Sequence, residues 1–258
     1  MEVSIELHEC ELGVLSHAHA RGLRRDLFRM VGDRTNAPFA LFRKRCALLD
    51  MPYRSARERN AVFARARQSM QRFVHSFHAE PDHCSGLVLL PAERVHEDGH
   101  AEPLLQLQHV SIDRRNGCMF GELRPIGSLS HHAVERIFQR LPTTSIDDVM
   151  HNITGLSVWF RLFQIVSIAS VASDHIEQLP LPSPHGVFLC VRETEDWRQV
   201  HMRTWIRHGA SPRYDASVAS IVDWCRSPGD SVEAILCSFE AMASRPENHW
   251  WRTPHQRE

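Results

Sequence analysis

The stretch 128-SLSHHAVERIFQRLPTTSIDDV-149 decides the expected fold, because it contains two helix starts separated by a proline. In its first half, apolar residues recur at steps of three and four positions: Val134, Ile137, Phe138 and Leu141. This spacing predicts an amphipathic helix over residues 131–141. Pro142 ends the helix, since proline lacks the N–H that the next turn needs.

A second helix is expected to begin after Ser145. The serine hydroxyl can accept a hydrogen bond from a backbone N–H of the first turn. Asp147 and Asp148 then lie in that turn, where the positive end of the helix dipole favours carboxylates. Gly155 is placed to bend or end this helix.

Strands are expected on the C-terminal side of these helices. Residues 187–192 and 199–207 are rich in β-branched and aromatic side chains, with a turn predicted near Glu195-Asp196. Three prolines before them predict a loop: Pro180, Pro182 and Pro184. Two closing helices are expected over residues 216–226 and 231–243.

A hairpin is expected on the N-terminal side. Residues 104–112 and 119–123 are strand-like, and Asn116-Gly117 between them suits a tight hairpin turn. Helices then sit on a small antiparallel sheet, so we expect an α+β fold. Residues 104–258 are predicted to form this α+β domain.

The first 80 residues are expected to form a basic helical region, with helices over residues 18–31 and 54–78. Residues 81–103 are interrupted by Pro and Gly, so we expect a linker or loop region there. The domain boundary is placed in this segment.

Charge is distributed unevenly although the whole chain has a formal net charge of −1. Residues 20–75 hold thirteen arginines and Lys44 against four acidic residues, a local balance of +10. Such a region attracts polyanions by releasing counterions, and nucleic acid is the first candidate. The alternative is that these arginines line solvated helix faces and pair with acidic residues elsewhere.

No membrane association is expected. The longest apolar run, residues 156–171, is interrupted by Arg161 and Gln164 and is shorter than the ~20 residues of a spanning helix, so it is expected to be a buried helix. The acidic first eleven residues do not resemble a secretory signal. Seven scattered cysteines suit reduced thiols. The expected location is cytoplasmic.

Candidate chemistry lies on the helix over residues 131–141. His132, Arg136 and Arg140 follow one another at four-residue steps, opposite the apolar stripe. RNA cleavage without a metal needs a group that takes the 2′-hydroxyl proton and cationic donors for the phosphorane, which this face could supply. The alternative is the ordinary solvated face of an amphipathic helix.

The strand over residues 199–207 is a second candidate. Alternation is expected to place a cationic and aromatic set on one face: His201, Arg203, Trp205 and Arg207. Guanidinium and aromatic planes stack on unpaired bases, so His201, Arg203 and Trp205 are expected to contact substrate. The competing interpretation is a partly buried strand with a polar outer face.

These segments resemble a known pattern. Ser130, His132-Ala133, Arg136 and Arg140, followed by Ser145 and Asp148-Val149, are similar to the "S-x-H-A-x-x-R-x-x-x-R … s-x-x-D-V" opening of small uncharacterised bacterial domains allied to the RelE/barnase/colicin-type ribonuclease toxins. The resemblance covers residues 128–207. It implies two helices before a small antiparallel sheet, with His132, Arg136, Arg140 and Thr204 as catalytic positions. This chain departs from the pattern by an apolar segment and a proline segment between the helices and the strands.

A zinc site is a weaker hypothesis. His75, His78, His83 and Cys84 are zinc-type ligands, but their spacing matches no standard finger. We therefore expect no metal and no cofactor.

The leading hypothesis is a metal-independent endoribonuclease of the bacterial toxin or effector type that acts on RNA. The alternative is a non-enzymatic regulator that binds nucleic acid or protein through the basic N-terminal region. A third hypothesis is an effector neutralised by a cognate inhibitor, or that inhibitor itself.

Overall fold

The structure is a computed structural model that describes residues 15–46, 55–96, 98–115, 118–141, 145–155, 178–193, 199–210, 212–226 and 232–248. The predicted α+β class is confirmed, as is the Arg-rich helix near the N-terminus. The chain forms two compact units: unit 1 comprises Met1–Arg25 and Gly127–Glu258, and unit 2 comprises Asp26–Ile126. Within the described ranges, no helix has the length and apolar character to cross a membrane.

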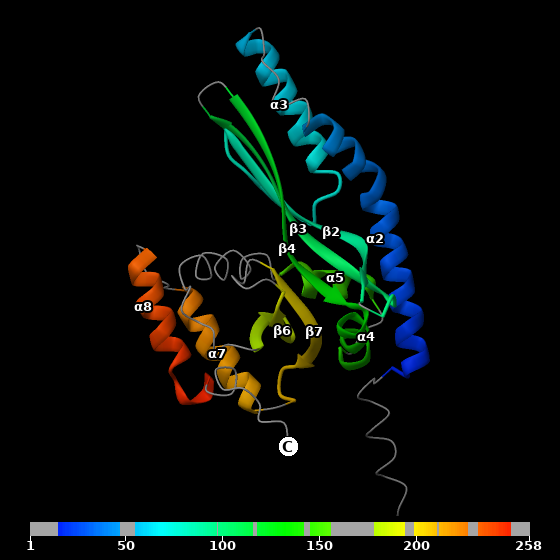
Figure 1. Cartoon of the computed structure of the whole chain (residues 1–258), viewed down its shortest axis with the longest axis vertical. Helices are drawn as coiled ribbons and strands as arrows, with labels where there is room; N and C mark the ends of the chain where they lie inside the picture. The colour runs from blue at the N-terminus through cyan, green and yellow to red at the C-terminus, as the bar shows by residue number, and fades with distance from the viewer. Residues whose placement is uncertain are drawn as a thin grey trace, which may run out of the picture. The chain divides into compact units, whose positions relative to one another are not determined.

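Unit 2 is a sheet covered by two helices (Figure 1). Its strands are β1 (Ser76–Ala79), β2 (His83–Val95), β3 (Ala101–Arg115) and most of β4 (Cys118–Ser130). They are neighbours in that order, and β1 with β2 and β2 with β3 are antiparallel. The helices are α2 (His17–Cys46), which enters this unit at Asp26, and α3 (Ala56–Met70).

The apolar faces of α2 and α3 form the core of unit 2 with the sheet. Phe73 lies at its centre, with edge-on contacts to Phe39 at 5.6 Å and Phe42 at 5.2 Å between ring centroids. Val88 of β2 and Val110 of β3 complete the cluster from the sheet side. Because both helices bury their apolar stripes here, their charged residues are left on the outer face.

The structure differs from the sequence prediction in two places in this unit. The helix expected to reach residue 78 ends at Met70, and β1 begins at Ser76. The prediction of a linker or loop over residues 81–103 is wrong, because residues 83–95 form β2. Pro91 fits in β2 since β1 pairs only with residues 84–87, which leaves no second strand to receive a donor from position 91. Unit 2 contains this whole segment, so the two units do not divide there.

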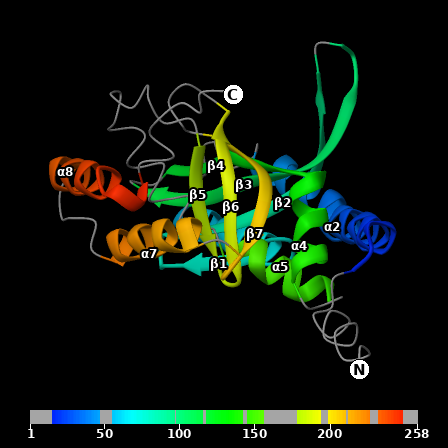
Figure 2. The same ribbon diagram turned by 90° about the horizontal axis from the view of Figure 1, so that it is seen from below.

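Unit 1 contains the last residues of β4 and three further strands, β5 (Gln178–Ser183), β6 (Gly186–Arg192) and β7 (Val200–Arg207) (Figure 2). β5–β6–β7 is an antiparallel meander, and β7 also pairs in parallel with β4 through Gly127↔Val200. The seven described strands join in the order β1-β2-β3-β4-β7-β6-β5. The helices of this unit are α4 (His131–Arg140), α5 (Ile146–Thr154), α7 (Pro212–Arg226) and α8 (Val232–Ala243), with a 3₁₀ turn at Pro246–Asn248.

Most predicted elements of unit 1 are confirmed. The Ser130 and Ser145 hydroxyls accept from the backbone N–H groups of Ala133 and Asp148, and Gly155 ends α5. The proline loop is wrong, because Pro180 and Pro182 lie in β5. β5 is an edge strand. Because Pro180 and Pro182 alternate along it, their nitrogens, which carry no hydrogen, can both face the side of β5 that has no neighbouring strand. The predicted buried helix over residues 156–171, and the turns at 116–117 and 195–196, lie outside the described residues.

Candidate functional site

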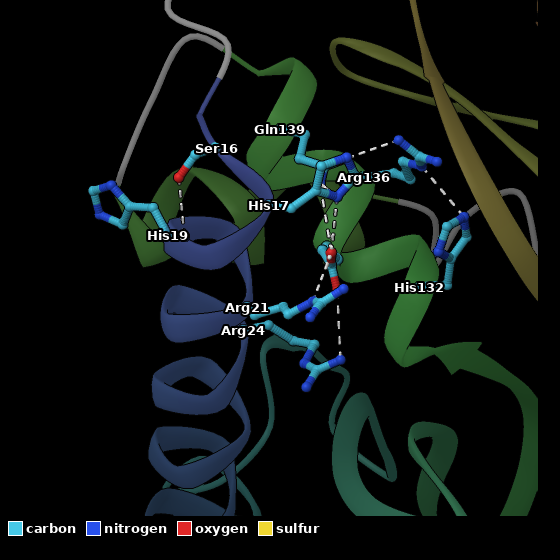
Figure 3. A network of polar contacts seen from close by, with 9 residues as sticks. Ser16, His17, His19, Arg21, Arg24, His132, Arg136 and Gln139 are labelled. Atoms are coloured by element: carbon cyan, nitrogen blue, oxygen red, sulfur yellow. Dashed lines mark hydrogen bonds and ion pairs between the residues drawn. The ribbon is translucent and has the colours of Figure 1, made fainter.

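A short chain of hydrogen bonds runs along α4 from the exposed His132 through the half-buried Arg136 to the buried Gln139 (Figure 3). Arg136 Nε donates to His132 Nε2 at 3.2 Å, and an Arg136 terminal nitrogen donates to Gln139 Oε1 at 2.8 Å. The opposite face of the helix, which includes Val134 and Phe138, is fully buried. The structure thus brings the predicted His132 and Arg136 into direct contact.

Arg136 and its surroundings keep His132 neutral. Partial desolvation lowers the pKa of His132, and the Arg136 charge lowers it further, while Glu135 acts in the opposite direction. The lone pair of His132 Nε2 accepts the Arg136 bond, which an imidazolium could not do. A neutral imidazole beside a guanidinium can take a proton from a hydroxyl while the cation stabilises negative charge nearby.

Arg140 has a structural partner. Its guanidinium donates to the main-chain carbonyl of Trp205, and Ser130 Oγ donates to the carbonyl of Arg203 at 3.0 Å. β4 pairs with β7 only as far as Met202, so α4 takes over and satisfies the carbonyls that follow. Arg140 therefore secures α4 against the edge of β7.

Behind this face lies a buried carboxylate that the sequence reasoning missed. The Glu135 side chain is 9% exposed and is surrounded by three basic groups of α2: His17 Nδ1 at 3.4 Å, Arg21 Nε at 3.6 Å and an Arg24 terminal nitrogen at 3.6 Å. Gln139 Nε2 lies 2.6 Å from His17 Nδ1. The signal available in the sequence was the position of Glu135 next to the apolar stripe of an otherwise basic helix.

The prediction that Trp205 lies on an open, substrate-contacting face of β7 is wrong, because its side chain is fully buried. Leu189 pairs with Thr204 and Cys190 with Met202, so Arg203 is the extra residue of a β-bulge. The bulge shifts the alternation by one, and Trp205 joins Met202 in the core. Its indole N–H donates to Ser183 Oγ at 3.1 Å. Of the predicted strand residues, Arg203 is exposed and Thr204 is half-buried.

His201 is also buried, and its environment is polar. The Ser128 hydroxyl lies 2.8 Å from His201 Nδ1 and 3.1 Å from a carboxylate oxygen of Glu193. Sequence reasoning missed Ser128 and Glu193, because they meet through the parallel pairing of Ser128 with His201 and the antiparallel pairing of β6 with β7.

The four proposed zinc ligands do not converge. His83 Nδ1 contacts Asp113 at 2.8 Å, and His78 Nε2 contacts Glu80 at 3.1 Å. His75 is half-buried and Cys84 is buried: burial lowers the pKa of His75 to about 4 and raises that of Cys84 to about 11. Across the ranges described, no group of three or more His, Cys, Asp or Glu side chains is placed to hold a metal ion.

No protein-family model, curated protein or solved structure matches this chain. The resemblance of residues 128–207 to toxin-like ribonuclease domains therefore stays a prediction.

Proposed function

We propose that the protein is an endoribonuclease that cleaves RNA without a metal ion, with His132 and Arg136 at its reactive centre. The observation that carries this proposal is the 3.2 Å bond between Arg136 Nε and a neutral, exposed His132. Both groups stand on one turn of a helix that is anchored on its other face, so their separation is maintained without substrate.

The reaction that fits this pair is transfer of the phosphate to the neighbouring 2′-oxygen. Arg136 Nε turns from His132 Nε2 to a phosphoryl oxygen, where it stabilises the charge that develops, and the freed Nε2 lone pair accepts the 2′-hydroxyl proton as the 2′-oxygen bonds to phosphorus. The bond from phosphorus to the 5′-oxygen breaks, and that oxygen takes a proton from water. The products are a 2′,3′-cyclic phosphate and a 5′-hydroxyl end.

The neighbouring predicted residues take different parts in this proposal. The exposed Arg203 and the half-buried Thr204 remain candidates for contact with the RNA backbone. Arg140 acts through the position of α4, since its guanidinium is bound to the Trp205 carbonyl. The buried indole of Trp205 plays no part in base stacking.

The test is cleavage of an end-labelled RNA in EDTA by the full chain. We expect His132→Ala to lower the rate by about 10²–10⁴-fold, the usual contribution of a general base. His151→Ala is the matched control, because His151 is an exposed histidine on the neighbouring α5. An RNA with one 2′-deoxy nucleotide should resist cleavage at that position only. Equal rates for His132→Ala and wild type would remove this residue from the mechanism.

A second candidate function is nucleic-acid binding without turnover, and the outer faces of α2 and α3 favour it. Residues 26–46 and 55–79 hold ten basic residues against three acidic ones. We define the helical basic layer as six exposed side chains in unit 2: Arg34, Arg43, Lys44, Arg57, Arg65 and Arg72. In the part of the chain that the structure describes, no ion pair neutralises them. Unpaired cations of this density suit a phosphate backbone.

The two candidates are separated by a gel-shift assay combined with the cleavage assay. Binding without any 2′,3′-cyclic phosphate product would support the second candidate and exclude the first. Binding through the helical basic layer should weaken steeply between ~50 and ~200 mM salt. Single-stranded RNA, duplex DNA and acidic lipid vesicles are compared as probes, because each presents phosphates in a different arrangement.

A further inference from the structure

The contacts around Gln139 determine which way its amide faces. A guanidinium has only donors, so the Gln139 oxygen must face Arg136, which lies 2.8 Å away. The amide nitrogen then faces His17 Nδ1 at 2.6 Å and Glu135 Oε1 at 3.4 Å. This orientation follows from the chemistry of arginine and needs no view of the hydrogens.

The same reasoning determines the state of His17. The Gln139 amide nitrogen can only donate, so His17 Nδ1 must accept and therefore carries no proton. When His17 takes up a proton, its Nδ1–H instead points at Glu135 Oε1, 3.4 Å away, and opposes the Gln139 donor. Two donors at 2.6 Å repel one another, and a turn of the amide relieves this contact and takes its oxygen away from Arg136.

We infer that Gln139 is a positioning residue that couples the proton on His17 to the placement of Arg136. The His17 side chain is 68% exposed, so solvent reaches its imidazole ring. Arg136 is held between Gln139 and His132 only while His17 is neutral. The catalytic meaning of this coupling rests on the proposed ribonuclease activity, whereas the coupling itself does not.

The charges around His17 come from both packed helices. From α4, Glu135 faces the His17 ring at 3.4 Å, and Arg136 faces it through Gln139. From α2, Arg21 and Arg24 approach the same carboxylate and compete for it. Because Glu135 has partners in either state of His17, the two-donor contact is relieved at the Gln139 amide or at the exposed His17 ring, and only a turn of the amide changes the contact with Arg136.

The first experiment follows the Arg136 Nε–H resonance by NMR across pH 5–8 in full-length His132→Gln protein, which removes the other imidazole that contacts Arg136. We expect the resonance to shift with the same midpoint as the His17 ring protons. The shift should vanish in the added His17→Ala variant and persist with His19→Ala, an exposed histidine two positions along α2 whose ring makes no contact with this network (Figure 3). An Arg136 resonance that ignores the His17 titration overturns the inference.

The second experiment measures kcat and KM for RNA cleavage against pH. Loss of activity on acidification should involve two protons in wild type, one on His132 and one on His17, and one proton in His17→Ala. Gln139→Glu should also give a one-proton dependence, because a carboxylate accepts from Arg136 and from protonated His17 together. Gln139→Met should lower kcat at every pH. If wild type cleaves no RNA, the proposed function fails and the NMR result alone decides the coupling.

Discussion

The two units use their polar side chains in opposite ways. On α4 of unit 1, the arginines have partners: Arg136 binds His132 and Gln139, and Arg140 binds the Trp205 carbonyl. In unit 2, the helical basic layer points into solvent.

This difference separates two kinds of electrostatic effect. A guanidinium with fixed partners acts over a few ångströms, where it sets the orientation and protonation of one neighbour. Exposed unpaired cations act over about a Debye length of ~10 Å at moderate salt and attract any polyanion. Mutations in unit 1 should therefore change stability or chemistry, and mutations of the helical basic layer should change salt-dependent association.

The largest effect on stability is expected at Trp205, whose carbonyl and indole both have partners. Trp205→Ala should lower the free energy of unfolding by about 3–5 kcal/mol, as for large aromatic truncations in a core. Arg203→Ala, at the exposed bulge position beside it, should change it by less than about 0.5 kcal/mol. Urea denaturation measures both. Similar values would show that β7 is not bulged as described.

An effect on the order of 3 kcal/mol on the free energy of unfolding is expected from His75 of unit 2, whose buried Nε2 has no hydrogen-bond partner among the described residues. The folded-state pKa of His75 is about 4, mainly because of burial and then because of Arg34, against an ordinary value of ~6.5 in the unfolded chain. As pH falls from ~6.5 to ~4, the unfolded state binds a proton that the folded state refuses, so stability is lost across this window.

His75→Phe tests this prediction, because it keeps a planar ring and removes the titrating nitrogen. Its stability should depend less on pH between ~4 and ~6.5 than that of wild type, measured by urea denaturation at each pH. His100→Phe is the control, since His100 is exposed. Parallel pH curves for wild type and His75→Phe would contradict the assignment.

The sequence was sufficient for elements whose signals are local. The helix α4 follows from its apolar stripe, and α5 from the Ser145 cap, because capping and periodicity depend only on residues within a few positions. The sequence prediction failed where pairing with a neighbouring strand determines the local structure. Prolines at 91, 180 and 182 predicted loops, yet they fit strands whose open sides need no donor.

The candidate site was predictable in part for the same reason. His132 and Arg136 are one helical turn apart, so their contact follows from spacing alone. Trp205 was placed on the wrong face because a bulge cannot be seen in the alternation of a single strand. The contact of His17 with Glu135 joins residues 118 positions apart, and no local pattern records it.

One carboxylate in each unit, each in contact with an arginine, allows the two kinds of ion pair to be compared by their effect on the free energy of unfolding. Glu135→Gln should cost about 2 kcal/mol, less than the ~3–5 kcal/mol of a fully buried pair because its partners His17 and Arg21 keep contact with water. Asp26→Asn removes an exposed carboxylate that lies 2.9 Å from Arg29, and should cost less than about 0.5 kcal/mol. Thermal unfolding at one pH measures both. Equal costs would mean that the partners of Glu135 contribute no more than a surface pair.

The smallest stability effect, with a distinct effect on binding, is expected from the helical basic layer. The triple variant Arg57→Gln, Arg65→Gln and Arg72→Gln should unfold within about 0.5 kcal/mol of wild type, because none of the three side chains has an ion pair in the described structure. If each arginine neutralises one phosphate, the slope of log K against log salt should flatten by about 2–3 in RNA-binding titrations. Arg21→Gln is the matched control, since Arg21 is an exposed arginine already engaged by Glu135. An unchanged slope in the triple variant would show that unpaired charge in unit 2 does not attract nucleic acid, and the contrast between the two units would then concern stability alone.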